Sequence, residues 1–204
     1  DSCRMTQTLA DMLDFLLVTH RHKDHYDSLL VRQCLDLGKQ VCLPPDIAAQ
    51  WEPHPCLHIF NDESLLDLST ANILGRRAFH VWRSTLDEVP LICYEVTLAS
   101  GHTFLFTGDA DYTRRPFRKT PNKNIDILFI TWRNPGELYE DGRPEKIGET
   151  EDAVGLGLDL IHPKRLILEH YGELEHIHGG FTASYDLAVR LKQALSLPVE
   201  FMFW

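Results

Sequence analysis

The sequence predicts a layered α/β fold, with helices on the outside and mostly mixed β-sheets inside. Near the start, an apolar strand, a polar loop, a helix and a second strand follow one another, as in one βαβ step. The middle of the chain holds short strands separated by turns, and strands and helices alternate again later. The length of 204 residues fits about one domain, so we expect a single domain over residues 1–204.

The first βαβ unit follows a short mixed segment, residues 1–12, that shows no clear period. Its helix is expected to be capped by Asp27 or Ser28 at the start and to end at Gly38, a residue suited to the C-terminal cap. The strands on either side of the polar loop and helix are apolar runs, expected at Phe15–Val18 and Gln40–Leu43.

Antiparallel hairpins are expected in the middle, with Ser100-Gly101 as a tight turn signal. The short strands predicted there are Leu57–Phe60, Leu65–Leu68, Arg77–Arg83, Leu91–Leu98 and Thr103–Thr107. A polar loop rich in proline and glycine, Asn134–Gly148, lies within the later part. The later elements are a strand, a helix, a strand, a helix and a terminal strand: Ile125–Thr131, Thr150–Ile161, Leu166–Glu169, a helix from Thr182 or Ser184, and Val199–Trp204.

Composition excludes several classes of protein. The net charge is −10 and the basic residues are scattered, which argues against general affinity for nucleic acid or anionic membranes. The five cysteines form no Cys-x-x-Cys pair, so we expect small buried apolar residues and a reducing, cytoplasmic compartment. No apolar run approaches the ~18 residues of a membrane span, and no signal peptide is visible. Oligomeric state has no signature in the sequence.

A dense cluster of ionisable side chains follows the first apolar strand. Three histidines and one aspartate stand within six positions: His20, His22, Asp24 and His25. Unpaired at the end of a buried strand, each would cost roughly several kcal/mol, so a cation is expected beside them. His20 and His22 can bind one ion, and Asp24 and His25 can present ligands to a second. Imidazole and carboxylate ligands suit zinc, manganese or iron, whereas the alternative is a surface histidine cluster on a loop.

The pattern His20-x-His22-x-Asp24-His25 after an apolar strand resembles the signature of the metallo-β-lactamase superfamily. Phe104-Leu-Phe-Thr-Gly108-Asp109 resembles the strand whose aspartate bridges two metals. The late strand before Tyr171 resembles the one whose histidine, here His170, completes the second metal site. The resemblance implies a four-layered αβ/βα sandwich of two mixed β-sheets, with helices on the outer faces and the site along one edge.

The family also places opening strands before the position of Asp1, and the fold is expected to lack them. Asp1 could correspond to the aspartate that ends an early strand and supports the site. Within the superfamily, the chain looks most like the branch of ascorbate-6-phosphate lactonases and N-acylphosphatidylethanolamine phospholipases. Tyr112 and Pro163-Lys164 fit that branch, whereas Lys23 stands where a neutral residue is common.

The family usually supplies a third ligand to the first metal from a histidine between the two motifs. His80 is the best placed, although the family histidine usually follows a strand, where Arg83 or Ser84 stands here. His80 is therefore equally open to being a ligand or an ordinary strand histidine. The full set of candidates is His54, His58, His80 and His102.

Two further residues have alternative roles. Asp109 follows a glycine at the end of an apolar strand, where a carboxylate can bridge two ions, but it could equally cap a Gly-Asp-Ala turn. His170 ends a buried strand and could be an ordinary edge histidine. For proton transfer to a leaving group, His178 or His176 could act from the next loop, and the alternative is an exposed polar loop.

These features predict a metal-dependent hydrolase in which a hydroxide bridged by two divalent metal ions attacks a small anionic substrate. The expected substrate is a phosphorylated ester, a lactone or a phosphodiester, whose anionic group Lys23 or Arg83 could hold. No nucleic-acid partner is expected. Asp24 and Asp109 set the charge of the site, Asp109 orients the hydroxide and His178 supplies the proton. Zinc is the first choice of metal, with manganese or iron as alternatives.

The alternative function is a non-catalytic or sensory metal-binding domain with an incomplete first metal site. A di-iron oxidoreductase of the same superfamily is disfavoured, because that class typically has a glutamate where His22 stands.

Overall fold

The computed structural model describes residues 2–78, 80, 88–110, 124–131, 154–155, 157–171, 189, 192–193 and 195–203. Within these residues the strands form two sheets. The smaller sheet has the order β1-β2-β3 and only parallel pairings: β1 (Phe15–Leu17), β2 (Gln40–Leu43) and β3 (Leu57–Ile59).

The larger sheet has the order β10-β9-β8-β7-β6-β5-β4. Its strands are β4 (Leu65–Asp67), β5 (Ala71–Ala78), β6 (Leu91–Leu98), β7 (Thr103–Phe106), β8 (Ile127–Thr131), β9 (Arg165–Tyr171) and β10 (Val199–Phe203). Strands β4 to β7 pair antiparallel and β7 to β10 pair parallel, so this sheet is mixed. The predicted antiparallel hairpins are therefore confirmed for β4 to β7, whereas the strand predicted at Leu57–Phe60 is β3 and pairs parallel to β2.

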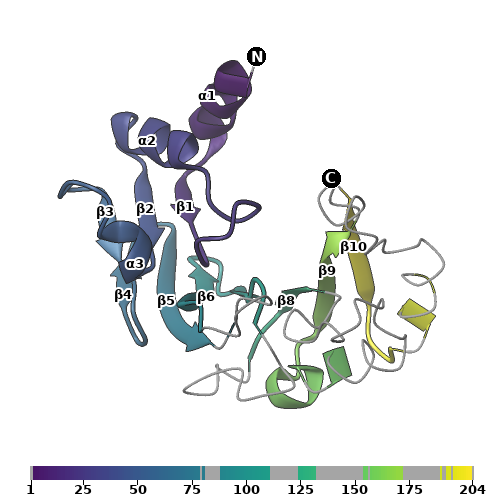
Figure 1. The fold of residues 1–204 in the computed structure, drawn as a ribbon. Coiled ribbons are helices and arrows are strands. Elements are labelled where there is room, and N and C mark those ends of the chain that lie inside the picture. Colours follow the sequence, from purple (N-terminus) through teal and green to yellow (C-terminus); the bar gives the residue numbers. More distant parts are fainter. Residues whose placement is uncertain are drawn as a thin grey trace.

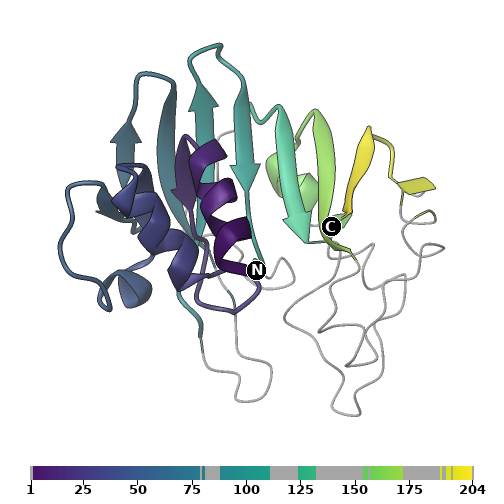
Figure 2. The ribbon, with the colours of Figure 1, turned by 90° about the horizontal axis from the view of Figure 1, so that it is seen from above.

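The two sheets and the helices stack in four layers (Figures 1 and 2). Helices α1 (Ser2–Met12) and α2 (Ser28–Asp36) cover the outer face of the smaller sheet, where Ala10 and Val31 pack against Val41. Helical residues 154–155 and 157–161 cover the outer face of the larger sheet. The predicted αβ/βα architecture is confirmed, with mixed pairing confined to the larger sheet among the described strands.

Helix α2 begins where the sequence predicts. The Asp27 carboxylate accepts hydrogen bonds from the backbone N–H groups of Leu29 (2.8 Å) and Leu30 (3.3 Å), which satisfies two donors of the first turn. Gly38 follows the helix with φ of 71°, a left-handed conformation that costs glycine little. This capped helix fixes where the preceding loop ends. That loop carries His20, His22 and His25 and is called the histidine loop below.

Tyr94 of β6 joins the two sheets. Its side chain is fully buried, and its hydroxyl donates to the carbonyl oxygen of Val18 at 2.7 Å, with the carbonyl oxygen of Cys42 at 3.2 Å. The backbone N–H of Ile92 donates to the carbonyl oxygen of Thr19 at 2.9 Å. These bonds hold the C-terminal end of β1 against the larger sheet.

Three local predictions were wrong or incomplete. Residues 2–12 form helix α1, whose apolar residues Met5 and Met12 are 75% and 78% exposed and so gave no buried stripe to detect. The short helix α3 (Pro45–Ala48), which follows β2, was not predicted. Strand β5 lies earlier than predicted, because its register with β6 places Ala71 opposite Leu98.

Three late elements lie partly or wholly outside the described residues. The helix predicted from Thr182 or Ser184 and the loop Asn134–Gly148 belong to this group. Of the helix predicted at Thr150–Ile161, residues 154–155 and 157–161 are helical. Within the described residues, the helices are too short and too polar to cross a membrane.

Candidate metal centre

The site is built on the loop that follows β1. The backbone N–H of Val18 donates to the carbonyl oxygen of Cys42 at 3.1 Å, and the chain then leaves the sheet. The Thr19 hydroxyl lies 3.0 Å from Nδ1 of His20, which fixes the ring and directs its Nε2 toward Asp109. A tight turn follows, in which the backbone N–H of His25 donates to the carbonyl oxygen of His22 at 3.0 Å. The turn brings the His25 ring to 4.2 Å from the His20 ring.

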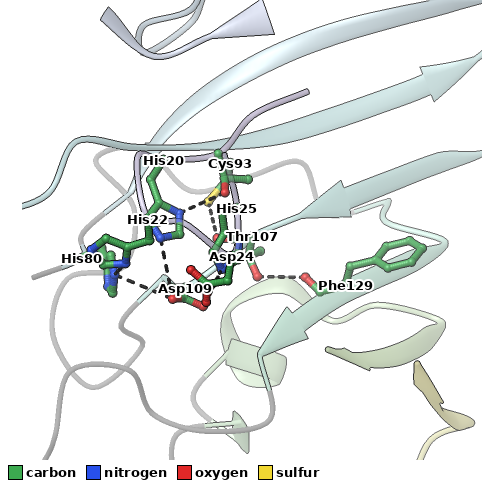
Figure 3. Close-up of polar contacts among 10 residues, drawn as sticks. His20, His22, Asp24, His25, His80, Cys93, Thr107, Asp109 and Phe129 are labelled. Carbon is green, nitrogen blue, oxygen red and sulfur yellow. Dashed lines mark hydrogen bonds and ion pairs between the residues drawn. The ribbon is translucent and has the colours of Figure 1, made fainter. Parts of the chain in front are cut away.

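Asp109 reaches this loop from the end of β7, and Gly108 makes the approach possible. Gly108 has φ of 49°, and a Cβ atom there would lie 2.8 Å from the Thr19 hydroxyl oxygen. Glycine is therefore required both by the backbone conformation and by the close contact between the two strand ends. The Thr107 hydroxyl donates to the carbonyl oxygen of Phe129 at 2.8 Å, which ties the end of β7 to β8 (Figure 3).

Four side chains form a first group, with one potential ligand atom of each within 4.8 Å of the others. Nε2 of His80 lies 3.2 Å from Nδ1 of His22, and the backbone carbonyl of His80 accepts a hydrogen bond from Val89. Oδ2 of Asp109 lies 3.7 Å from Nε2 of His20 and 3.8 Å from Nε2 of His80. The members of this first group are His20, His22, His80 and Asp109 (Figure 3).

A second group contains Asp24, His25 and the same Asp109. Nε2 of His25 lies 3.7 Å from Oδ2 of Asp24 and 3.5 Å from Oδ1 of Asp109. Asp109 thus presents Oδ2 to the first group and Oδ1 to the second. A carboxylate in this position can bridge two cations.

The electrostatics of the first group favour neutral imidazoles. Burial lowers the pKa of His20 well below its usual value, and the neighbouring His25 lowers it further. Burial also lowers the pKa of His22. A neutral imidazole keeps the lone pair with which it binds a metal ion. Nε2 of His20 is buried and makes no hydrogen bond with any described residue, which fits a position facing a metal ion.

Comparison of the sequence with family models and with curated proteins gives no match. Solved structures do match. A protein named as a metal-dependent hydrolase from Parabacteroides distasonis matches with a TM-score of 0.65 at 18% identity, over 92% of this chain and 75% of that one. YhfI, a metallo-β-lactamase-fold protein from Bacillus subtilis, matches with a TM-score of 0.56 at 18% identity, over 95% of this chain and 76% of that one.

The chain has the metallo-β-lactamase fold. CmlA, a diiron β-hydroxylase from Streptomyces venezuelae, also matches, with a TM-score of 0.59 at 16% identity, over 95% of this chain and 45% of that one. At these identities the likeness establishes the fold, and the chemistry rests on the residues of the site itself.

In this metallo-β-lactamase fold, His80 is the candidate histidine that joins the first group. The other candidates lie elsewhere. His58 contacts Gln40 at 2.6 Å, Nδ1 of His54 accepts from the backbone of Cys56 at 3.2 Å, and the exposed His102 lies 3.7 Å from Asp126. Strands β5 and β7 both run antiparallel to β6, so His80, two residues after β5, lies at the edge of the sheet where β7 ends.

The structure describes the remaining predicted residues only in part. Lys23 is exposed on the histidine loop. His170 lies on the described strand β9, but its side chain is outside the described residues. Several predicted residues lie wholly outside them: Asp1, Arg83, Ser84, Tyr112, His176 and His178.

Two residues that position the site were not predicted from the sequence. Thr19 orients His20, and Tyr94 holds the strand end that carries both. A buried tyrosine in an apolar strand has no local signature of such a role. The Gly-Asp pair, by contrast, did mark Asp109 as a candidate ligand, and the structure adds the reason for the glycine, its close contact with Thr19.

Proposed function

We propose that this protein is a metal-dependent hydrolase with a two-metal centre in the metallo-β-lactamase fold. The observation that carries the proposal is the placement of Asp109, whose two carboxylate oxygens face two different groups of potential ligands. The names of the matched proteins from Parabacteroides distasonis and Bacillus subtilis support it. We also propose a single domain over residues 1–204, supported by a core cluster in which Cys42 of the smaller sheet packs with Ile73 and Tyr94 of the larger sheet.

The proposed ligands divide between the two metal ions. His20, His22 and His80 bind the first ion, and Asp24, His25 and His170 bind the second, with Asp109 shared. Imidazole-rich surroundings favour zinc at the first position, and manganese or iron also suits these ligand types. The diiron centre of CmlA, which has a similar fold, supports iron as the main competitor.

Bound divalent ions supply Lewis acidity, which lets water act as a nucleophile near neutral pH and polarises the oxygen of the substrate. Asp109 orients the attacking water, because its carboxylate lies between the two groups. His178 donates the proton to the leaving group. The proposed substrates are small anionic molecules: phosphorylated esters, lactones and phosphodiesters, as in the branch of ascorbate-6-phosphate lactonases and N-acylphosphatidylethanolamine phospholipases.

The alternative, a sensory or non-catalytic metal-binding domain, rests on an incomplete first site and on the absence of the family's opening strands. The distance of 3.2 Å between His80 and His22 argues against the first of these two grounds.

Metal content and turnover test the proposed function together. The purified protein, grown with zinc, manganese or iron, is expected to hold close to two metal ions per chain. Asp109→Ala is expected to lose most of the metal and about a thousandfold in kcat/KM for a 4-nitrophenyl phosphodiester, because Lewis-acid stabilisation is worth several kcal/mol. Mass spectrometry of the metals and release of 4-nitrophenol measure the two effects.

The matched control is Asp67→Ala, which removes an exposed carboxylate on β4. It is expected to keep both the metal and the activity. Less than one metal ion per chain, unchanged by His22→Ala, would contradict both the site and the mechanism.

A further inference from the structure

The histidine loop is held at its two ends, and residues 45–51 contact it in between. At the ends, the carbonyl oxygen of Val18 accepts from the Tyr94 hydroxyl, and Asp27 caps α2. Residues 45–51, called the α3 segment below, comprise α3 and the turn that follows it. The α3 segment contacts the histidine loop at two positions, each directly beside candidate metal ligands.

The first contact is an ion pair between Arg21 and Asp46. Nη1 of Arg21 lies 3.7 Å from Oδ2 of Asp46. Arg21 stands between His20 and His22, whose side chains both belong to the first group. The same short stretch of chain therefore presents two imidazoles to the metal centre and a guanidinium to the α3 segment.

The Asp46 carboxylate is more shielded than the carboxylate of an ordinary surface ion pair. Its side chain is 21% exposed as a whole, but both oxygens are covered from solvent and neither makes a hydrogen bond with any described residue. Such a carboxylate needs a cation close by, because its desolvation cost is otherwise uncompensated. Among the described residues, Arg21 is the cation within 4.0 Å of it. Asp46 therefore holds Arg21 on the α3 segment.

The second contact is a hydrogen bond between two aromatic side chains. The indole N–H of Trp51 donates to the hydroxyl oxygen of Tyr26 at 3.1 Å. Tyr26 directly follows His25, a member of the second group, and its backbone N–H donates to the carbonyl oxygen of His22 at 2.9 Å. The bond from Trp51 therefore bears on the turn that carries the ligands of the second group.

The α3 segment is itself well packed. Ile47 and Ala48 are 0% and 4% exposed and belong to the core cluster of the smaller sheet. Their backbone N–H groups donate to the carbonyl oxygen of Pro44 at 3.2 and 2.9 Å. Trp51 packs against the same cluster, and the guanidinium carbon of Arg32 lies over its ring, 5.5 Å from the centroid. Both contacts to the histidine loop thus come from a fixed part of the fold.

We propose that Asp46 and Trp51 are positioning residues for the metal centre. Asp46 acts through Arg21 on the first group, and Trp51 acts through Tyr26 on the second. Neither Asp46 nor Trp51 belongs to a group of potential ligands, so their effect on metal binding is indirect. The proposal rests on the proposed function, because it concerns how the same centre is held in shape.

The sign of the change in zinc affinity distinguishes positioning from simple electrostatics. If only Coulomb forces mattered, removing the positive charge of Arg21 would strengthen the binding of a cation. Positioning predicts the reverse, so Arg21→Met and Asp46→Asn are each expected to weaken the first zinc ion about tenfold. The double variant should lose about as much as either single variant, because the two side chains act as one unit. Arg21→Lys, which keeps the charge, should recover most of the lost affinity.

Zinc titration of the full chain in competition with a chelating dye measures these affinities. Cobalt adds a readout that a loss of folding stability alone does not change, because the visible absorption of bound Co²⁺ depends on its ligand geometry. Arg21→Met is expected to alter this spectrum, and urea unfolding of the metal-free protein checks that the variant folds. Lys164→Met is the matched control, since it removes an exposed cation from Asp126, a carboxylate with a similar exposed fraction of 20%. It should change neither the zinc affinity nor the cobalt spectrum.

The second contact has its own variants. Tyr26→Phe and Trp51→Phe each remove the hydrogen bond between the two side chains but keep an aromatic ring in the core cluster. Each is expected to weaken the second zinc ion about fivefold and to affect the first ion less, since one hydrogen bond contributes about 1 kcal/mol. These two variants test the proposal independently of the ion pair.

The outcomes separate this inference from the proposed function. Zinc affinity that is unchanged in Asp46→Asn, or increased in Arg21→Met, overturns the positioning role of Asp46. Zinc affinity that is unchanged in both phenylalanine variants overturns the role of Trp51. In each of these cases the unaltered chain still binds two zinc ions and the proposed function stands. Absence of zinc binding by the unaltered chain overturns the proposed function itself.

Discussion

The two groups of potential metal ligands share Asp109 but differ in burial. In the first group His20 and His80 are 0% and 2% exposed. In the second group the side chains of Asp24 and His25 are 28% and 15% exposed. Packing therefore fixes the geometry of the first group, whereas the second group faces solvent.

The groups also differ in charge. With neutral imidazoles, the first group has Asp109 as its carboxylate, whereas the second has both Asp24 and Asp109. Nitrogen-rich sites select zinc, and oxygen-rich sites accept harder ions such as manganese. If the proposed metal ions bind as two ions, we expect the two positions to hold them with unequal affinity.

The largest expected effect comes from removing one ligand from each group. His80→Ala is expected to lose the first metal ion and Asp24→Asn the second, each leaving close to one ion per chain and lowering kcat/KM by at least about a hundredfold. Equilibrium dialysis with zinc and manganese measures which ion is lost. His102→Ala, which removes an exposed histidine outside both groups, is the control. If both variants kept two ions with unchanged affinities, the division into groups would be wrong.

A smaller effect is expected from the strand ends that bring the groups together. Gly108→Ala combines a positive φ of 49° with a contact of 2.8 Å to the Thr19 hydroxyl, and should cost about 2–3 kcal/mol of unfolding free energy and weaken both metal sites. Urea denaturation and metal analysis measure these effects.

Gly101→Ala is the matched control for this variant. Gly101 also has a positive φ, 87°, but a Cβ atom there meets nothing within 4 Å. It should therefore cost only the conformational strain, about 1 kcal/mol, and leave the metal content unchanged. Equal costs for the two variants would show that the contact with Thr19 does not matter.

The smallest expected effect is the response of the metal-free protein to acid, which depends on the buried first group. Because burial lowers the pKa of His20 well below its usual value of 6.5, the unfolded chain takes up a proton on acidification before the folded protein does. The contribution of His20 to stability is therefore complete above about pH 6.5 and is lost as the pH falls, by at most about 1.4 kcal/mol per pH unit.

Burial also lowers the pKa of His22, so its effect has the same sign. Urea unfolding of the metal-free protein at pH values from about 8 to about 5 measures the slope, and His20→Asn should flatten it. Stability that increased on acidification would contradict this assignment.

Much of the first group could be predicted from sequence because it is local. His20 and His22 follow an apolar run that predicts a buried strand, and Asp27 caps the next helix as its position before Ser28 suggested. Strand β6 was predicted with its observed bounds, Leu91–Leu98, because the apolar run Leu91–Tyr94 is continued at alternate positions by Val96 and Leu98. Strand β5 was misplaced because Arg76 and Gly75 interrupt its apolar pattern, although Arg76 pairs across the strands with Glu95 at 3.6 Å.

The sequence by itself determined the fold class, the histidine loop and the candidacy of Asp109 after an apolar strand. Tertiary structure alone decided that His80 joins the first group and that Asp109 faces both groups. The physical reason is distance along the chain. Thr19 meets Gly108, and Tyr94 meets Val18, only after two separate sheets have packed together, and no local pattern records those contacts.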